Sequence, residues 1–222
     1  MTARTSVDAG PRRLTVVLFP GFELLDVFGP VELCQAVPGL EIDYAARVPG
    51  LVPSSQGVQV LAEAAWQDVE PDILLVPGGP GTRAIAADQR QLNEVAELAG
   101  RASVVSSVCT GSAVLAAAGA LAGYRATSNK RAFEWVASCG EGVEWDPSAR
   151  WVHDRDRWTS SGVAAGMDMA CALITWLFGA ESARESARRC EYTPNSDPSA
   201  DPFALDHELP GADAPLPDAR RL

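Results

Sequence analysis

The feature that most constrains the fold of this chain is an alternation of short apolar runs with helix-forming segments. Three runs, "LTVVLF" (14–19), "DILLVPGG" (72–79) and "ASVVSSV" (102–108), have the length and composition of buried parallel strands. "EIDYAAR" (41–47) predicts a further strand, and "QRQLNEVAELAGR" (89–101) predicts an amphipathic helix. Strands that alternate with helices predict an α/β fold with a doubly wound, mostly parallel sheet and helices on both faces.

The remaining segments of the core predict elements that complete this sheet. "KRAFEWVASCG" (130–140) predicts a helix with Gly140 at its C-cap position. The other expected elements are a turn and helix at 20–37, a hairpin at 51–64, short strands at 143–147, 149–154 and 157–162, and two closing helices at 163–178 and 180–192.

Composition divides the chain into three parts. Residues 1–12 predict a flexible leader, and residues 13–192 predict one α/β domain. Residues 193–222 contain six of the sixteen prolines and many acidic residues, so they cannot form a regular core element. We expect this segment to be either a solvated tail or a strap pinned by Phe203 and Leu205.

Charge and hydropathy limit the classes of partner. The net charge of −11 at pH 7 argues against binding to nucleic acids or anionic membranes, which favour basic patches. The first residues lack the apolar stretch of a secretory signal, and the most apolar helix is short for a membrane span. These features predict a cytoplasmic protein that acts on a small-molecule substrate.

The five cysteines do not predict a disulfide framework or a zinc site, because their number is odd, their spacing is wide and no CxxC occurs. We therefore expect no metal and no cofactor. Four of them, Cys34, Cys139, Cys171 and Cys190, lie in helical patterns among apolar or mixed neighbours and are expected to pack as small hydrophobic side chains.

The fifth, Cys109, lies where a buried strand turns into an alanine-rich helix, in "VVSSVCTGSAVLAAAGAL" (104–121). Ligands of doubly wound sheets bind at the carboxyl ends of the strands. The free N–H groups and partial positive charge of a helix start are expected to lower the pKa of this thiol. Together with the small residues that follow, they predict a nucleophile elbow with sulfur in place of oxygen. The alternative is a buried structural cysteine.

A nucleophile of this kind needs hydrogen-bond donors for developing negative charge and a group that moves protons. The glycine N–H groups of "PGGPG" (77–81) are candidate donors, although the segment also suits an ordinary turn between strand and helix. Asp26 follows the first strand among apolar neighbours, so desolvation and a nearby thiolate are expected to raise its pKa and keep it protonated. A simple capping role is the alternative for Asp26, and a structural role is the alternative for Glu32. Asp168, inside an apolar helix, is expected to be structural.

Five segments taken together resemble the ThiJ/PfpI superfamily, and more closely its isonitrile hydratase branch. They are "LFPGFELLDVFGPVE", "DILLVPGGPGTRAI", "VVSSVCTGSAVLAAAGALAGYRAT", "SSGVAAGMDMA" and "CEYTP", in that order, and the match runs from about Leu14 to Tyr192. The resemblance implies a flavodoxin-like fold and a homodimer.

The resemblance also implies roles for individual residues. Cys109 matches the nucleophile, and Asp26 matches the acid that hydrogen-bonds the thiolate. Thr110 matches the residue that marks the hydratase branch. Gly78 and Gly79 match the glycines beside the cysteine, which we assign to substrate binding.

One segment departs from the family pattern. Many members have a histidine followed by tryptophan after the nucleophile helix, whereas this chain has Asn129 and Lys130. Asn129 is therefore expected to form part of the substrate-binding wall. Neither His153 nor His207 is expected to take the place of that histidine.

The sequence thus predicts a cysteine-dependent hydratase that converts an isonitrile to an N-substituted formamide through a thioimidate on Cys109. The alternatives are another cysteine-dependent enzyme of the superfamily, for example a glyoxalase-like one, and a non-catalytic ligand or redox sensor. Related domains occur in transcription regulators that continue into a basic helix-turn-helix domain, but the acidic C-terminal segment here favours an enzyme.

Overall fold

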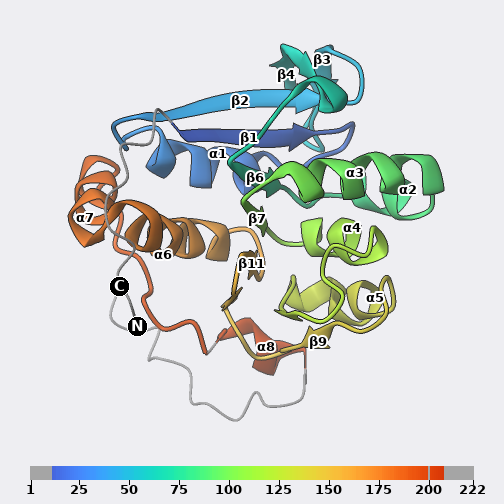
Figure 1. The fold of residues 1–222 in the computed structure, drawn as a ribbon. Helices are drawn as coiled ribbons and strands as arrows, with labels where there is room; N and C mark the ends of the chain where they lie inside the picture. Colours follow the sequence, from blue (N-terminus) through green and yellow to red (C-terminus); the bar gives the residue numbers. More distant parts are fainter. Residues whose placement is uncertain (1–11, 200, 208–222) are drawn as a thin grey trace.

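The apolar runs form one seven-stranded sheet in the order β10-β11-β7-β6-β1-β2-β5 (Figure 1). In this computed structural model, which describes residues 12–199 and 201–207, neighbouring strands are parallel except for the antiparallel pair β10–β11. The strands are β1 (Arg12–Leu18), β2 (Leu40–Ala46), β5 (Ala64–Ala65), β6 (Ile73–Val76), β7 (Val104–Ser107), β10 (Trp151–Asp154) and β11 (Arg157–Ser160). The predicted mostly parallel sheet is confirmed.

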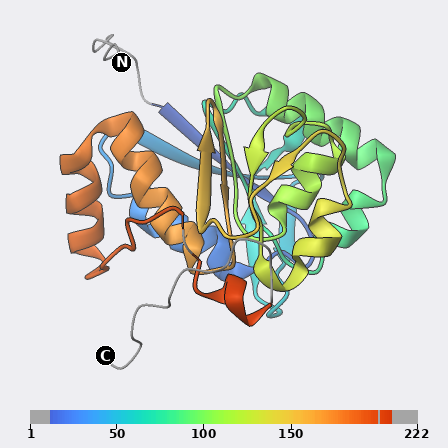
Figure 2. The same ribbon diagram turned by 90° about the horizontal axis from the view of Figure 1, so that it is seen from below.

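Helices cover both faces of the sheet, which lies between two helical layers in Figure 2. One layer contains α1 (Leu24–Cys34), α6 (Ala165–Phe178) and α7 (Ala180–Arg189), and the other contains α2 (Thr82–Ala86), α3 (Gln89–Arg101), α4 (Gly111–Ala117) and α5 (Phe133–Ala137). Every residue of β6 and β7 is buried, as expected for central strands covered on both faces. In the described part of the chain, no helix combines the length and the apolar character that a membrane span requires.

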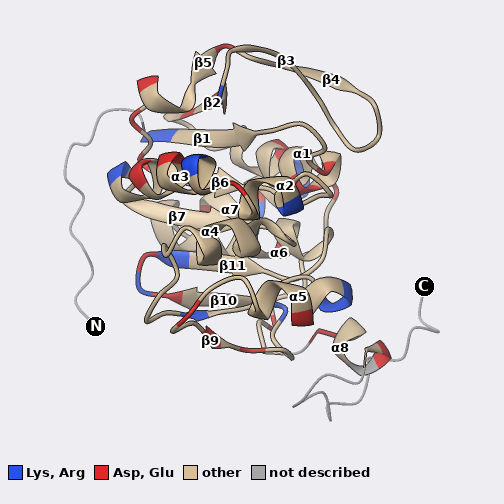
Figure 3. Cartoon of the chain, turned by 90° about the vertical axis from the view of Figure 1, so that its right-hand side faces the viewer, with Lys and Arg blue, Asp and Glu red and all other residues tan. Residues whose placement is uncertain are grey.

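Helix α3 shows why these segments fold as the pattern predicts. Its N-cap residue Asp88 accepts hydrogen bonds from the N–H groups of Arg90 and Gln91, so two of the free donors of the helix start are satisfied. One face is buried and apolar, and the other carries charges of both signs (Figure 3). On that face the Glu94 carboxylate forms an ion pair at 2.7 Å with Arg47, the residue that follows β2. The buried residues are Leu92, Val95, Leu98 and Ala99.

Smaller elements lie outside the main sheet. β3 (Gly50–Pro53) and β4 (Gln59–Ala62) form the predicted hairpin, and β8 (Arg125–Ala126) pairs with β9 (Glu144–Trp145). The described residues also form the 3-10 helices η1 (Trp66–Asp68) and η2 (Lys130–Ala132).

The prediction that Gly140 is a C-cap residue is wrong. Helix α5 ends at Ala137 and its C-cap residue is Ser138. A Cβ atom on Gly140 would lie 2.6 Å from the carbonyl oxygen of Ala116 in α4. A glycine is needed here because α4 approaches closely, and not because the helix ends in a left-handed residue.

The segment after α7, here called the strap (193–199 and 201–207), lies against β10 and the turn that precedes it. The N–H group of Arg150 donates to the carbonyl oxygen of Pro198 at 2.9 Å, and the N–H group of Asp201 donates to that of Ser148 at 2.8 Å. The strap ends in the short helix α8 (Phe203–Asp206).

Asp168 of α6 anchors the start of the strap. Its buried carboxylate accepts hydrogen bonds from the Arg150 guanidinium at 2.6 Å, from the N–H group of Asn195 at 2.7 Å, and from the Tyr192 hydroxyl. The expectation that this carboxylate is structural and finds partners is therefore confirmed.

Phe203 is not the residue that pins the strap, because its side chain is 56% exposed. The buried residues of this segment are Asp201 and Ala204. Among the described side chains and backbone groups, the contacts that hold the strap are backbone hydrogen bonds and charged groups. The side chain of Leu205 and residues 1–11, 200 and 208–222 lie outside the described part of the structure.

Candidate active site

The predicted elbow is present at the carboxyl end of β7. Cys109 has a φ of 58°, one of three positive values among the non-glycine residues of the described chain. Two backbone hydrogen bonds hold it in place, from Val108 to Val76 at 3.1 Å and from Cys109 to Ser161 at 3.0 Å. A Cβ atom on Gly111 would lie 2.1 Å from the Val76 carbonyl oxygen, so only glycine fits there. Such left-handed strain in a side-chain-bearing residue is typical of functional sites.

The fold brings Asp26, from the first turn of α1, to this elbow. The carboxyl group is fully buried, and its Oδ2 atom accepts a hydrogen bond from Gly78 N at 2.9 Å. Oδ1 is buried without a hydrogen-bond partner among the described residues. Burial raises the pKa of Asp26 to about 7, against the lowering effect of the Gly78 and Cys109 hydrogen bonds. The predicted rise is confirmed, and Asp26 can take up or release a proton near neutral pH.

The expected lowering of the Cys109 pKa is wrong. Burial, followed by the negative charge of Asp26, raises the pKa of this thiol well above its ordinary value. Hydrogen bonds from the Thr110 N–H group, the Thr110 hydroxyl and the Asn129 side chain lower it by less. The hydrogen bonds at the helix start therefore lower the pKa of Cys109, as predicted. Burial and the charge of Asp26 raise this pKa by more, because Cys109 is only 7% exposed and faces a carboxyl group.

Cys109 and Asp26 consequently behave as one titrating pair. Two negative charges in this buried space oppose each other, so the pair retains a proton through neutral pH. The thiolate forms when the proton of Cys109 moves to Asp26. This arrangement can deliver a nucleophile and an acid in the same step.

The glycines Gly78 and Gly79 shape this site through their backbone. Gly78 N donates to Asp26, and Gly79 N donates to Thr110 Oγ1 at 3.0 Å, so both N–H groups already have side-chain acceptors. A Cβ atom on Gly78 would lie 2.6 Å from Thr110 N and 2.8 Å from Asp26 Oδ2. A glycine is thus needed at position 78 so that Asp26 can lie close to the elbow. The hydrogen-bond donors to the Cys109 thiol come instead from Thr110 and Asn129.

Asn129 is the residue at the N-cap of η2. Its Oδ1 atom accepts a hydrogen bond from Ala132 N at 3.1 Å and caps η2. This bond leaves the amide NH₂ group to donate to Cys109. A Cβ atom on Gly162 would lie 3.2 Å from Nδ2, so a glycine there gives the amide room.

Two polar residues of the site were not predicted. Ser128 Oγ donates to the Cys109 carbonyl oxygen at 2.9 Å, and Thr82 Oγ1 lies 3.2 Å from Thr110 Oγ1. Both are buried. For Thr82 the available signal was its position directly after the glycine turn 77–81, since such turns gather at the carboxyl edge of the sheet.

Other residues singled out from the sequence lie elsewhere. Glu32 is exposed near the end of α1, and His153 stacks on Trp158 with ring centroids 3.9 Å apart. Among residues 12–199 and 201–207, no group of three or more His, Cys, Asp or Glu side chains is arranged to hold a metal ion. All five cysteines are free thiols.

Comparison with known proteins identifies the family. The profile of the DJ-1/PfpI family matches residues 12–175. The chain belongs to the DJ-1/PfpI family. The resemblance found in the sequence motifs is thereby confirmed.

The named relatives of the chain include enzymes of more than one kind. An isonitrile hydratase from Pseudomonas putida is 33% identical over 179 residues, which are 80% of this chain and 77% of that protein. A deglycase from Thermococcus kodakarensis is 25% identical over 136 residues, 60% of this chain and 80% of that protein. A crystal structure of a ThiJ/PfpI family protein from Pseudomonas syringae superimposes with a TM-score of 0.76 at 30% identity, covering 88% of this chain and 83% of that one.

Proposed function

We propose that this protein is a cysteine-dependent hydratase that adds water to an isonitrile and releases an N-substituted formamide. The observation that carries the proposal is the buried pair of Cys109 and Asp26, which can supply a sulfur nucleophile and a proton together. The similarity to an isonitrile hydratase supports the choice of substrate class.

The terminal carbon of an isonitrile accepts both a nucleophile and a proton, and this matches the two groups of the pair. Asp26, as carboxylate, takes the thiol proton of Cys109 while the sulfur atom bonds to that carbon. Asp26 then gives the proton to the same carbon, which produces a thioimidate with a C–H bond. The pair carries a single negative charge throughout, because one proton moves between the two groups, so two negative charges never face each other in the buried site.

Water completes the reaction by adding to the thioimidate carbon. Asp26 takes a proton from the water and passes it to the nitrogen atom. The carbon–sulfur bond then breaks, the hydroxyl proton returns to Cys109, and the formamide leaves. Hydrogen bonds from Thr110 and Asn129 stabilise the sulfur as it departs.

The assay that tests this proposal is steady-state turnover of an aryl isonitrile, with the formamide measured by chromatography. We expect formamide to accumulate in proportion to enzyme. The matched comparison is methylglyoxal, chosen because of the similarity to a deglycase. Turnover of methylglyoxal without turnover of isonitriles would contradict the proposal and favour the glyoxalase-like alternative. The glyoxalase-like alternative would pair the cysteine with a histidine. Here Asn129 stands where many family members have that histidine, and its side chain contacts Cys109.

A redox sensor is the less favoured alternative. Oxidation by peroxide requires an accessible thiolate. Cys109 is 7% exposed, and burial raises the pKa of its thiol. These properties favour a thiol that reacts only when Asp26 accepts its proton.

The pH dependence of kcat/KM provides a further prediction. Below about pH 7 Asp26 is protonated and cannot accept the thiol proton, so the active form of the pair is the one that has lost a single proton. We expect kcat/KM for an isonitrile to rise with pH with an apparent pKa of about 7. The measurement is a pH profile at constant ionic strength. A profile that is flat through neutral pH would contradict the assigned role of Asp26.

A further inference from the structure

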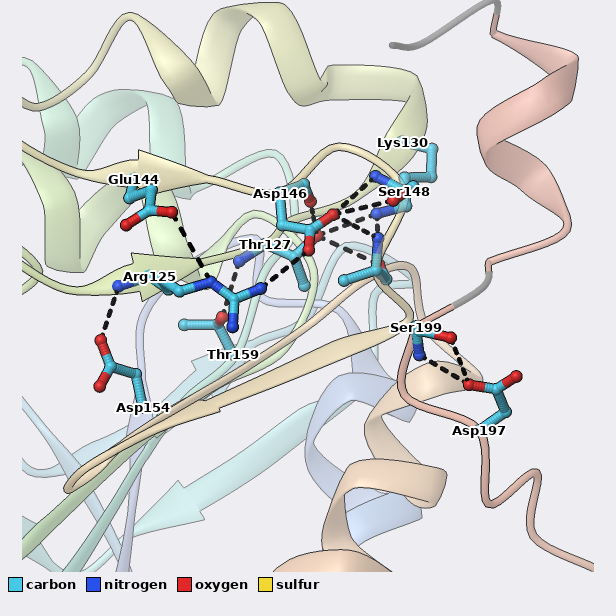
Figure 4. A network of polar contacts seen from close by, with 11 residues as sticks. Arg125, Thr127, Lys130, Glu144, Asp146, Ser148, Asp154, Thr159, Asp197 and Ser199 are labelled. Carbon is cyan, nitrogen blue, oxygen red and sulfur yellow. Dashed lines mark hydrogen bonds and ion pairs between the residues drawn. The ribbon is translucent and has the colours of Figure 1, made fainter. Parts of the chain in front are cut away.

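Lys130 is a buried titratable group that the proposed mechanism does not use. Its side chain is 3% exposed, and its Nζ atom donates to Thr127 Oγ1 at 2.9 Å and to the Ala149 carbonyl oxygen at 2.5 Å. Thr127 belongs to the polar network in Figure 4, which also contains Lys130, Asp146 and Ser148. The ammonium group thus joins the 127–132 turn to the loop that precedes β10.

The charges around Lys130 come from that loop and from the strap. Asp201 and Asp146 favour the ammonium form, whereas Arg150 opposes it, and burial lowers the pKa of Lys130 to about 8. Asp201 is buried, and its Oδ2 atom has no hydrogen bond among the described residues and lies 3.9 Å from Arg150 Nη1. Its Oδ1 atom accepts from Phe203 N and holds the start of α8. The strap therefore places a buried carboxylate near the Arg150 guanidinium, and the charge of this carboxylate favours the ammonium form of Lys130.

The same turn also contacts the nucleophile. Ser128 Oγ donates to the Cys109 carbonyl oxygen at 2.9 Å, and the Asn129 amide donates to the Cys109 sulfur. Thr127, at the start of the turn, receives the Lys130 hydrogen bond and donates to the Asp146 carbonyl oxygen at 2.7 Å. Since Lys130 immediately follows Asn129, the anchor of the ammonium group fixes the backbone from which Asn129 reaches the sulfur.

We propose that Lys130 is a positioning residue that couples the strap to Cys109 by holding Asn129 against the sulfur atom. The inference rests on the proposed role of Cys109 as the nucleophile. Asn129 itself touches the reacting sulfur and so acts directly. Lys130 acts through Asn129, and Asp201 acts on Lys130 from the strap.

The test measures the reactivity of Cys109 without any isonitrile. Alkylation of Cys109 by iodoacetamide is followed at neutral pH, with the modified residue identified by peptide mass spectrometry. The variants are Asn129→Ala, Lys130→Met and the double variant. Because a hydrogen bond to a charged group contributes roughly 1.5–3 kcal/mol, Asn129→Ala is expected to slow alkylation by about 10-fold or more. Lys130→Met is expected to slow it in the same direction.

The double variant decides whether Lys130 acts through Asn129. If it does, adding Lys130→Met to Asn129→Ala causes no further loss, because the interaction that Lys130 positions is already absent. Losses that multiply, or a Lys130→Met variant that alkylates at the normal rate, would overturn the inference. A purely structural role would lower the unfolding temperature without this dependence on Asn129.

Asp201→Asn provides the same test without removing the ammonium group, and it keeps the inference testable if Lys130→Met does not fold. We expect it to slow alkylation of Cys109 in the wild-type background and to have no effect in the Asn129→Ala background. Phe203→Ala is the control, since Phe203 is an exposed residue of the same strap. An unchanged rate for Asp201→Asn would show that the strap is not coupled to Cys109.

The isonitrile assay then separates the two proposals. If the alkylation pattern is as expected but no formamide forms, the proposed function is wrong and the coupling stands. If formamide forms normally in Lys130→Met and alkylation is unchanged, the function stands and the coupling is wrong.

Discussion

Replacing Cys109 by alanine is expected to lower kcat for formamide production by about 10⁴-fold or more, because the step that forms the carbon–sulfur bond can no longer occur. Cys109 is the only residue of the described site whose side chain can form that covalent intermediate, since Asp26 is committed to proton transfer in the proposed mechanism. The measurement is steady-state turnover with the formamide quantified directly.

The fold should tolerate this substitution. Alanine keeps the Cβ atom at the left-handed φ of 58°, so the backbone strain of the elbow is unchanged. Cys190→Ala is the matched control, because Cys190 is a free, partly exposed thiol at the end of α7. We expect it to retain full turnover. A Cys109→Ala variant that still produced formamide at an appreciable rate would remove the sulfur from the mechanism.

Replacing Asp26 by asparagine is expected to lower kcat by about 10²–10⁴-fold, the contribution that a positioned proton-transfer group makes. Asparagine has nearly the same shape and can still accept the Gly78 N–H hydrogen bond through its side-chain oxygen. It cannot take the thiol proton from Cys109. The rise of kcat/KM through neutral pH should disappear with it.

The same substitution is expected to increase stability above neutral pH. The pKa of Asp26 is raised from 3.8 to about 7 by burial, so the folded state binds a proton that the unfolded state releases between these values. Ionisation of the folded protein therefore lowers the free energy of unfolding as pH rises through this window. The rise in pKa corresponds to about 4 kcal/mol, which is an upper limit for the gain from Asp26→Asn at pH 8.

Urea unfolding of both proteins at two pH values tests this expectation. The difference in unfolding free energy should be large above the folded pKa and small near pH 4, where the carboxyl group is protonated in the native state. Glu32→Gln is the control on the same helix, because Glu32 is exposed. If the difference in unfolding free energy between the two proteins is the same at both pH values, ionisation of the buried Asp26 carboxyl group does not destabilise the fold.

Loss of activity combined with a gain of stability would identify Asp26 as a residue retained for chemistry. Oδ1 is buried without a hydrogen-bond partner in the described chain, which a fold optimised for stability alone would avoid. Burial of the Asp26 carboxyl group would thus both raise its pKa into the range needed for proton transfer and lower the stability of the fold above neutral pH.

The sequence by itself determined the architecture and pointed to Cys109 and Asp26 as the candidate pair. The apolar runs that became β1, β6 and β7 can be buried only in a sheet covered on both faces, so their pattern led to the correct fold. The small residues after Cys109 marked the elbow, because a tight turn between strand and helix admits little else. The apolar neighbours of Asp26 indicated desolvation and hence a raised pKa.

Only the tertiary structure decided how the pair titrates and what holds it. The helix start predicts a low pKa for Cys109, but burial and the charge of Asp26 are long-range effects that outweigh it. The direction of the Asn129 amide depends on a hydrogen bond from Ala132 N, and the Lys130 ammonium group is held by the carbonyl oxygen of Ala149, nineteen residues further along the chain. Such contacts between distant segments leave no local periodicity, because they depend on which loops the fold brings together.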